Sequence, residues 1–443
     1  MRLPEGAAFI LERLGERGHQ AYVVGGCVRD SLMGLEPKDF DVCTSALPQE
    51  MQAAFADCRV VETGLKHGTL TVLYDHTPYE VTTFRVDGTY TDHRHPDGVT
   101  FVSDVTADLS RRDFTINAMA WHPRTGVVDA FGGREDLRRR VIRCVGDPLQ
   151  RFEEDALRIL RALRFASVYG FIIEEETASA IHALKPTLAK VAPERIRIEL
   201  AKLLCGQAAE DILREYSDVL FTLFPALAPM YRFDQRTPYH VYDVWEHTLH
   251  TLAAAPPTEV MRLTMLLHDS GKPGAFFLDS NGVGHAHGHP QRSMEIAREV
   301  LTWLRVDNAT LNRVLMLVAN HDYPLTPDRR IILRRLNKFG EEVLRQLIDV
   351  HRADGMGKGT VSPEMVEDWA ATMHRSVDTV LAEKPCFTLK DLSVSGNDLL
   401  QAGIPKGRAV GQCLQALLEM VIDGKLPNER DALLSAAPTC LTE

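Results

Sequence analysis

The first candidate site in the sequence consists of two aspartates, Asp39 and Asp41, which are separated by a single residue. In a β-strand, residues i and i+2 point to the same side, so this spacing predicts two adjacent carboxylates. Two such charges repel each other unless a cation lies between them. Carboxylate oxygens suit Mg²⁺, and paired metal ions suit in-line displacement at phosphorus. Glu80, in a second expected strand, is a candidate third ligand. The alternatives are a solvated aspartate pair in a turn and an exposed glutamate.

A glycine pair precedes these aspartates. Gly25 and Gly26 end a short apolar run at residues 21–24 and open an expected helix. Glycines let the backbone approach a phosphate closely, and a helix N-terminus favours an anion. Arg29, one turn further on, adds a cation. The same residues also fit an ordinary turn between a strand and a helix, so this pattern alone leaves both interpretations open.

The run RRDFTINAMA supplies a third group of polar side chains. Arg111 and Arg112 suit phosphate oxygens, which a planar guanidinium binds in a bidentate manner. Asp113 and Asn117 carry side chains that suit ribose hydroxyls. The alternative is a helix start that Asp113 caps.

The run RFEEDALRILRALRFASVYGF has helical spacing and predicts a helix that carries Glu154 and Asp155. Asp155, Arg158 and Arg161 follow at i, i+3 and i+6 and share one side of that helix, which Arg164 extends. Ion pairs along a solvated helix face are the alternative. However, residues 111–164 contain twelve arginines, no lysine and eight acidic residues. This local excess of arginine in an acidic protein favours recognition of an anion by geometry.

These motifs, in this order and spacing, resemble the class II tRNA nucleotidyltransferase and bacterial poly(A) polymerase family. The resemblance implies an α/β nucleotidyltransferase head, a small mixed or antiparallel sheet with helices, followed by mostly α-helical neck, HD and tail domains. It implies that Asp39 and Asp41 are catalytic and hold Mg²⁺. It also implies a set of nucleotide-binding residues: Gly25, Gly26, Arg29, Arg111, Arg112, Asp113, Asn117, Asp155, Arg158, Arg161 and Arg164.

The resemblance also implies a task for each group. The glycine pair and the first arginines would hold the triphosphate, and Asp113 and Asn117 would read the ribose. Asp155 and Arg158 would hydrogen-bond the base edge and select CTP or ATP. The polar loop at residues 85–96 resembles the flexible element needed for adding a terminal A, which favours CCA addition to tRNA. A poly(A) polymerase and an enzyme that adds only the A remain alternatives.

A second constellation of metal-binding residue types lies further along the chain. His268-Asp269 follows an apolar helical run, and His247 lies 21 residues earlier. This order resembles the HD phosphohydrolase superfamily, in which a later aspartate completes the metal site. Asp354 is the candidate for that aspartate. Imidazole and carboxylate ligands together suit a divalent transition metal or Mg²⁺.

Two further histidines, His289 and His321, are candidates for a second metal site in the same region. The resemblance implies a metal-dependent phosphohydrolase acting on RNA ends or nucleotides, as a phosphatase or a cyclic phosphodiesterase. This activity is an alternative main function for the chain. An HD domain that has lost turnover is the other possibility.

The elements that must position these groups change in character along the chain. The N-terminal part is strand-rich, with alternating or β-branched runs at residues 69–74 and 80–84. From about Pro148 onwards, helical spacing dominates, and proline-containing breaks mark boundaries. We therefore predict four domains: a nucleotidyltransferase head at 1–145, a helical neck for nucleotide selection and RNA binding at 146–235, an HD domain at 236–360 and a helical tail at 361–443.

Composition narrows the class of protein. The 443 residues are 45% hydrophobic and 25% charged, with a formal net charge of −11, which argues against disorder and against a general nucleic-acid coat. Eight scattered cysteines without a C-x-x-C pair argue against a zinc ribbon and fit a reducing compartment. Because no apolar run approaches the ~18 residues of a membrane span, we expect a cytoplasmic protein with no membrane partner.

Overall fold

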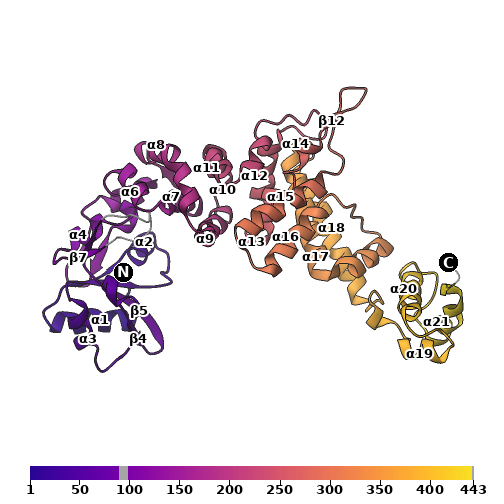
Figure 1. Ribbon diagram of the computed structural model, residues 1–443, viewed down its shortest axis with the longest axis horizontal. Coiled ribbons are helices and arrows are strands. Elements are labelled where there is room, and N and C mark those ends of the chain that lie inside the picture. The colour runs from indigo at the N-terminus through magenta and orange to yellow at the C-terminus, as the bar shows by residue number, and fades with distance from the viewer. Residues whose placement is uncertain (89–97, 442–443) are drawn as a thin grey trace. The chain divides into compact units, whose positions relative to one another are not determined.

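The computed structural model describes residues 1–88 and 98–441 (Figure 1). The chain divides into two compact units, residues 1–228 and 229–443. The finer division into four domains, with boundaries at 145, 235 and 360, stays a prediction. Residues 89–97, which make up most of the loop predicted to serve addition of a terminal A, lie outside the described residues.

A mixed seven-stranded sheet is the centre of the first unit. Its strands are β1 (Ala21–Val24), β2 (Asp41–Thr44), β3 (Arg59–Val61), β4 (Thr69–Tyr74), β5 (Thr77–Thr83), β8 (Ala120–His122) and β9 (Gly126–Val128). Their order is β3-β4-β5-β2-β1-β8-β9, with β2 and β5 parallel and the other pairs antiparallel. The predicted α/β head with a mixed sheet is therefore confirmed.

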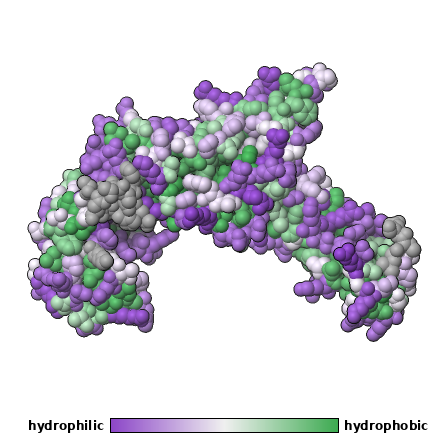
Figure 2. Space-filling model, viewed as in Figure 1, coloured by the Kyte–Doolittle hydropathy of each residue, from purple (hydrophilic) through white to green (hydrophobic). Residues whose placement is uncertain are grey.

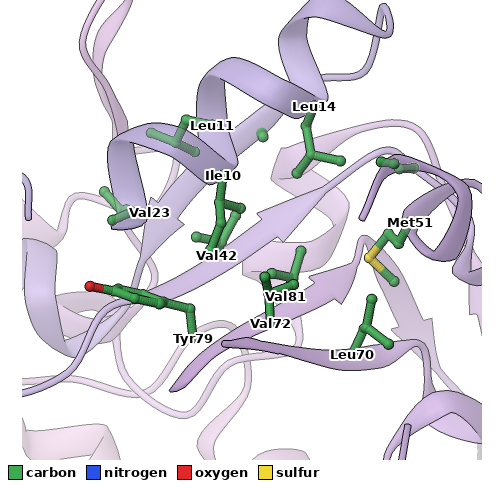
Figure 3. Packing of buried hydrophobic residues seen from close by; sticks show 14 of the residues in the cluster. Ile10, Leu11, Leu14, Val23, Val42, Met51, Leu70, Val72, Tyr79 and Val81 are labelled. Carbon is green, nitrogen blue, oxygen red and sulfur yellow. The ribbon is translucent and has the colours of Figure 1, made fainter. Parts of the chain in front are cut away.

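Apolar residues on both faces of the sheet explain why it forms. Successive side chains of a strand point to opposite faces. Val23 and Val42 pack with Ile10 and Leu14 of α1 (Glu5–Glu16), while their strand neighbours join a second cluster. Figure 3 shows the first cluster, in which side chains of α1 meet the valines of the strands. Burial on both faces fixes the strand register, and with it the position of the polar motifs at the strand ends.

Helices surround this sheet and continue after it. The remaining helices of the first unit are α2 (Gly26–Leu32), α3 (Pro48–Ala54), α4 (Val105–Ser110), α5 (Gly133–Arg139), α6 (Pro148–Glu154), α7 (Leu157–Tyr169), α8 (Glu175–Leu184), α9 (Pro193–Leu204), α10 (Ala209–Glu215) and α11 (Ser217–Leu223). Short strands are β6 (Arg85–Asp87), β7 (Val99–Phe101), β10 (Val141–Ile142) and β11 (Ile172–Ile173). The 3₁₀ turns are η1 (Leu65–His67), η2 (Thr115–Asn117), η3 (Lys185–Lys190) and η4 (Pro225–Met230), the last spanning the boundary between the units.

The predicted single helix through residues 154–164 is wrong at one position. Helix α6 ends at Glu154 and α7 begins at Leu157, with Asp155 in an extended conformation between them (φ −142°, ψ 103°). The side chain of Asp155 accepts a hydrogen bond from the Leu157 N–H at 3.1 Å. A short acidic side chain at a helix start satisfies an N–H group that has no partner within the helix. Asp155 therefore does not share a helix stripe with Arg158.

The second unit is almost entirely helical (Figure 1). Its elements are α12 (Val244–Ala254), α13 (Glu259–Leu267), α14 (Lys272–Ala275), β12 (Phe277–Leu278), β13 (Gly284–His285), α15 (His289–Trp303), α16 (Asn308–Ala319), α17 (Arg329–Lys358), α18 (Pro363–Ala382), η5 (Leu389–Asp391), α19 (Gly396–Gln401), α20 (Arg408–Ile422), α21 (Arg430–Ala436) and η6 (Ala437–Leu441). Gly340 interrupts α17 with a φ of 75°, a conformation that glycine adopts without strain. The mostly helical remainder that the sequence predicts is confirmed.

The outer surface is mixed in character. Figure 2 shows hydrophobic and hydrophilic residues interspersed over the visible face. In the described ranges, 1–88 and 98–441, no helix combines the length and the apolar character that crossing a membrane requires.

Candidate active site and metal centre

Three carboxylates meet where β1, β2 and β5 lie side by side. Asp41 is the first residue of β2 and pairs with Val24, the last residue of β1. The parallel pairing of β2 with β5 places Glu80 next to Asp41. Asp39 lies in the loop before β2, so the prediction that both aspartates stand in one strand is wrong, because the strand begins only at Asp41.

Desolvation and the neighbouring acids both raise the pKa of Asp41. The surrounding protein withdraws Asp41 from much of the bulk water, and this desolvation, together with the charges of Glu80 and Asp39, raises the pKa of Asp41 to about 6. Arg112 opposes the shift. A carboxylate whose pKa is raised by neighbouring acids gains stability from a cation, and an all-oxygen set suits a hard ion. All three residues nevertheless keep solvent-accessible surface, so a substrate can reach them.

The glycine pair lies against an arginine of the predicted site. Gly25 has a φ of +80°, and its N–H donates to the carbonyl of Met119. A Cβ at Gly25 would lie 2.9 Å from Nη1 of Arg112, and one at Gly26 would lie 3.5 Å from Nη2 of Arg29. Both the backbone conformation and the close guanidinium therefore require glycine at position 25.

Asp108, a buried residue that the sequence analysis did not single out, forms ion pairs with Arg111 and Arg112. Asp108 is fully buried, and its Oδ1 accepts hydrogen bonds from Nε and Nη2 of Arg111 at 3.0 and 2.9 Å. Its Oδ2 lies 3.6 Å from Nη2 of Arg112. Asp108 precedes the arginines by three and four residues, which is the spacing of neighbours on a helix. That spacing was the available signal, although α4 ends before the arginines.

A chain of hydrogen bonds joins the predicted ribose and triphosphate residues. Nη1 of Arg29 donates to Oδ1 of Asn117 at 2.5 Å, and Nδ2 of Asn117 donates to Oδ1 of Asp113 at 3.1 Å. Oδ2 of Asp113 accepts from Nε and Nη2 of Arg161 at 2.8 and 2.5 Å. Although burial opposes ionisation, Arg161 and Asn117 lower the pKa of Asp113 to about 2. The structure thus brings these four residues together, each engaged with another.

The predicted base-reading residues have separate partners. Oδ2 of Asp155 accepts from Nη2 of Arg195 at 2.8 Å. Nη1 of Arg158 donates to Oε2 of Glu154 at 2.6 Å, and its Nη2 donates to the carbonyl of Arg111 at 3.2 Å. The alternative of an ion pair between Glu154 and Arg158 is present, yet both side chains are mostly buried rather than on a solvated face.

Helix α9 contributes two partners that sequence reasoning missed. Besides Arg195, it carries Glu199, which is buried and lies 2.5 Å from Nε of Arg164 and 3.9 Å from Nη1 of Arg161. Arg195 and Glu199 are four residues apart and share a helix face. The sequence predicts this helix, but it does not show which face meets α7.

In the second unit, the four predicted metal ligands come together. The ligand atoms of His247, His268, Asp269 and Asp354 lie within 4.8 Å of one another. Nε2 of His247 is 3.1 Å from Oδ1 of Asp354 and 3.3 Å from Oδ2 of Asp269. Nε2 of His268 is 3.3 Å from the same Oδ2.

A second group shares Asp269 with the first. Nε2 of His289 and Nε2 of His321 lie 3.3 and 3.5 Å from Oδ1 of Asp269, and 3.1 Å from each other. The two oxygens of Asp269 thus face different groups, an arrangement suited to a carboxylate that bridges two ions. Within the described ranges, groups this tight occur only around Asp269, whereas the head carboxylates are more open.

The orientation of the imidazoles fits metal binding. Each histidine of the two groups donates its Nδ1–H to a backbone carbonyl: His247 to Gly357 (2.9 Å), His268 to Met265 (2.7 Å), His289 to Ala286 (2.8 Å) and His321 to Val318 (2.8 Å). Because a carbonyl oxygen only accepts, Nδ1 carries a proton, and Nε2 is the ring nitrogen that faces the carboxylates and could bind a metal. The four Nε2 atoms and the oxygens of Asp269 thus face one another at 3.3–3.5 Å, in a group of imidazole and carboxylate ligands that also includes Asp354. The donor set therefore fits a divalent metal.

Two lysines balance the buried acids. Nζ of Lys272 lies 2.6 Å from Oδ2 of Asp269, and Nζ of Lys358 lies 2.6 Å from Oδ2 of Asp354. Although burial opposes ionisation, His268 and Lys272 hold the pKa of Asp269 well below its usual range. His247 and Lys358 do the same to the pKa of Asp354. Both carboxylates are therefore ionised and available as ligands.

Profiles of known protein families match three segments of the chain. The Poly A polymerase head domain matches residues 21–143, which contain the sheet and the carboxylates. A profile described as "Probable RNA and SrmB-binding site of polymerase A" matches residues 170–230. The tRNA nucleotidyltransferase domain 2 matches residues 291–437.

Whole-length relatives agree with these profiles. A CCA-adding enzyme of Limosilactobacillus reuteri is 50% identical over 433 residues, covering 97% of this chain and 95% of the relative. One of Levilactobacillus brevis is 37% identical and covers 96% of both. The crystal structure of Bacillus stearothermophilus CCA-adding enzyme in complex with CTP is 28% identical, with a TM-score of 0.72 over 99% of this chain and 98% of that one. The chain therefore belongs to the family of CCA-adding enzymes, within the tRNA nucleotidyltransferases that the sequence motifs predict.

Proposed function

We propose that this protein adds the nucleotides CCA to the 3′ end of tRNA, using CTP and ATP as substrates. One arrangement in the head carries this conclusion. Asp41 and Glu80 lie side by side near Arg112, and the guanidinium of Arg112 lies against the turn at Gly25. The carboxylates can bind a metal ion, and the guanidinium and the accessible backbone can bind the phosphates of a nucleoside triphosphate. Relatives of this chain over nearly its full length are CCA-adding enzymes.

The reaction is attack of the RNA 3′-hydroxyl on the α-phosphate, with pyrophosphate leaving in line. Asp39 and Asp41, with Glu80 as a third candidate, would hold Mg²⁺. When bound, Mg²⁺ lowers the pKa of the attacking hydroxyl and stabilises the leaving group. Arg112 neutralises phosphate charge beside Gly25, while Asp108 keeps its guanidinium in place.

Nucleotide choice would depend on Asp155 and Arg158. One side chain accepts and the other donates, so together they can pair with the edge of a base. A base with the wrong edge leaves buried polar groups unpaired, which is costly. The partners at Arg195 and Glu154 keep the two side chains in fixed positions before a nucleotide binds.

Sizing the products on defined tRNA transcripts tests the proposal. Transcripts that end at the discriminator base, at C and at CC are incubated with Mg²⁺ and with CTP, ATP or both. We expect growth by three, two and one nucleotides, followed by a stop. Growth of only the CC transcript by one A would indicate an A-adding enzyme, and long A-tails on generic RNA would indicate a poly(A) polymerase.

A metal-dependent phosphohydrolase in the second unit is the second candidate function. It rests on one specific observation, the four imidazole Nε2 atoms that converge on the buried Asp269. A divalent transition metal or Mg²⁺ suits this donor set. The test measures phosphate release from nucleotides, which Asp39→Ala should leave intact and His268→Ala and Asp269→Ala should abolish. Equal release by all variants would exclude this function.

The four-domain division and the cellular site complete the proposal. We assign the head to residues 1–145, the neck to 146–235, the HD domain to 236–360 and the tail to 361–443. The profile matches at 21–143 and 170–230 fall within the first two segments. The first compact unit ends at residue 228, which favours an end of the neck near 235. Because its relatives act in tRNA maturation, we place the protein in the cytoplasm.

A further inference from the structure

One aromatic ring, that of Phe165 in α7, lies against three of the arginines predicted to bind the nucleotide. The distances from its centroid to the guanidinium carbons are 3.7 Å for Arg164, 5.1 Å for Arg29 and 5.5 Å for Arg161. All three lie within the ~6 Å over which a ring face attracts a cation. Arg161 stands one helical turn before Phe165, whereas Arg29 belongs to α2. The ring therefore joins segments that are far apart in the sequence.

These contacts lie where little water reaches. Phe165 is buried, and the side chains of Arg29 and Arg164 are only 9% and 14% exposed. The attraction between a cation and a ring face is stronger when both are desolvated. The ring is therefore a substantial partner for these side chains.

Each of the three guanidinium groups also has a carboxylate partner. The pairs are Arg29–Asp30 (2.7 Å), Arg161–Asp113 (2.5 Å) and Arg164–Glu199 (2.5 Å). Three cations around one ring would repel one another without such partners. Because the carboxylates already balance the charge, the contribution of the ring is to fix where the cations lie.

A ring face holds a cation without occupying its N–H groups. It attracts the guanidinium as a whole, whereas a carboxylate accepts hydrogen bonds from individual N–H groups. Glu199 meets Nε of Arg164, so among the described residues the two terminal amino groups of Arg164 stay available to phosphate oxygens. A planar guanidinium that is fixed in place and keeps its N–H groups suits recognition of a phosphate.

A second ring ties the same group to α2. Tyr169, one turn after Phe165, stacks on it at 6.1 Å with an angle of 9° between the planes. The centroid of Tyr169 lies 5.0 Å from the guanidinium carbon of Arg29, and its hydroxyl donates to Oδ1 of Asp30 at 3.3 Å. Arg29 therefore packs against two rings of α7, so the position of the helix that opens at Gly26 depends on α7.

We infer that Phe165 is a positioning residue for nucleotide addition, whose ring fixes Arg29, Arg161 and Arg164 for the incoming nucleotide. It acts through parts of the site that CTP and ATP share. Its loss should therefore weaken binding of both nucleotides alike and leave the choice of base unchanged. The inference rests on the proposed nucleotide addition and adds a residue that no motif of the sequence singled out.

Fluorinated phenylalanines at position 165 test the inference at nearly constant side-chain shape. Fluorine withdraws negative charge from the ring face, so 4-fluoro- and then 3,4,5-trifluorophenylalanine weaken the attraction to a cation stepwise. Titration of the full-length protein with CTP or ATP, with Mg²⁺ and without RNA, gives the dissociation constants. We expect both constants to rise stepwise, and to rise roughly 5- to 30-fold in Phe165→Leu, the range that cation–π contacts provide.

Phe152, a fully buried ring of α6 that lies outside this group of arginines, is the matched control. The same fluorinated residues at position 152 should leave both dissociation constants unchanged. Thermal unfolding of each variant separates weaker binding from loss of folded protein, because unfolded chains lower the number of binding sites and not their affinity. Any nucleotide bound in the second unit contributes equally to all variants.

Constant affinity for CTP and ATP through the fluorinated series at position 165 would overturn the inference, since a ring that only fills space does not respond to its charge distribution. Equal losses at positions 165 and 152, or a loss confined to one nucleotide, would also overturn it. Extension of a CC-ending tRNA by the wild type is measured alongside. A stepwise loss of affinity without extension would retain the positioning role and remove the proposed function. Extension with constant affinity would do the reverse.

Discussion

The head and the second unit each gather acidic side chains, but in opposite ways. In the head, Asp39 in a loop, Asp41 at the start of β2 and Glu80 within β5 are exposed and loosely grouped. Around Asp269, the ligand atoms of each group lie within 4.8 Å of one another, and most of the side chains are buried. The head carboxylates are therefore open to solvent and need a cation between them and the phosphates of a nucleotide. The second site is preorganised for metal ions.

The supporting groups differ in the same way. Buried charges destabilise a protein unless they are paired, and Lys272 and Lys358 pair with the two acids of the second unit. In the head, the charges opposite the carboxylates come from Arg112 and from the arginines beyond it, which are held by Asp108 and Asp113. A site whose cations face the substrate suits turnover of a polyanion.

The largest effect is expected from removing a head carboxylate. Asp41→Ala should slow nucleotide addition by about 10³-fold or more, the equivalent of the several kcal/mol that a bound metal supplies to the transition state. Single-turnover extension of a CC-ending tRNA with ATP measures this effect. Glu36→Ala, an exposed acid in the preceding loop, is the control. A rate close to wild type in Asp41→Ala would remove the head from the mechanism.

Removing the shared ligand of the second unit should abolish metal binding there and leave nucleotide addition unchanged. In Asp269→Asn, both groups lose an anionic ligand, so affinity should fall by more than the ~10–100-fold that loss of an outer partner costs. Elemental analysis after dialysis gives the number of divalent ions per chain. Asp322→Asn, at an exposed neighbour of His321 outside both ligand groups, serves as the control. Unchanged ion content in Asp269→Asn would show that the ions bind elsewhere.

Nucleotide selection should depend on Arg158. Arg158→Ala should raise misincorporation of UTP and GTP by about 10- to 100-fold, because the base edge loses its donor. Its effect on tRNA affinity should be much smaller. Product sequencing and a tRNA binding curve measure the two quantities, with Arg138→Ala, on an exposed face of α5, for comparison. Comparable misincorporation in wild type and Arg158→Ala would remove Arg158 from base recognition.

A smaller effect is expected from a residue outside the ligand set. A Cβ at Gly357 would lie 2.3 Å from Cγ2 of Thr251 and 3.1 Å from Nδ1 of His247, so Gly357→Ala should displace the imidazole. We expect about tenfold weaker metal binding, at the low end for outer partners. Gly355→Ala, in the same helix, meets only the side chain of Val366 at 3.1 Å and is the control. If both variants bind metal as the wild type does, the orientation of His247 is not limiting.

The predictions from the sequence are confirmed where the residue pattern of a segment matches the helix or strand that the segment forms. The strands at 21–24 and 69–74 and the mixed sheet are confirmed, the first from an apolar run and the second from alternating or β-branched residues. The break at Asp155 was missed because a capping side chain and a helical one look alike within a helical run. Arg195 and Glu199 were missed because contacts between distant segments leave no local signal. Asp108 was missed although its spacing to Arg111 and Arg112 is a local signal. The four ligands around Asp269 were found because ordered His and Asp residues follow a motif.

The most direct test of the account uses protein stripped of metals by a chelator and then supplied with Mg²⁺ alone. A tRNA transcript ending at the discriminator base is incubated with this protein, CTP and ATP, and the transition-metal content is measured in the same sample. The account predicts growth by three nucleotides and a stop, with no transition metal bound. No growth until a transition metal is restored would contradict the independence of the two sites, and growth beyond three nucleotides would contradict CCA addition.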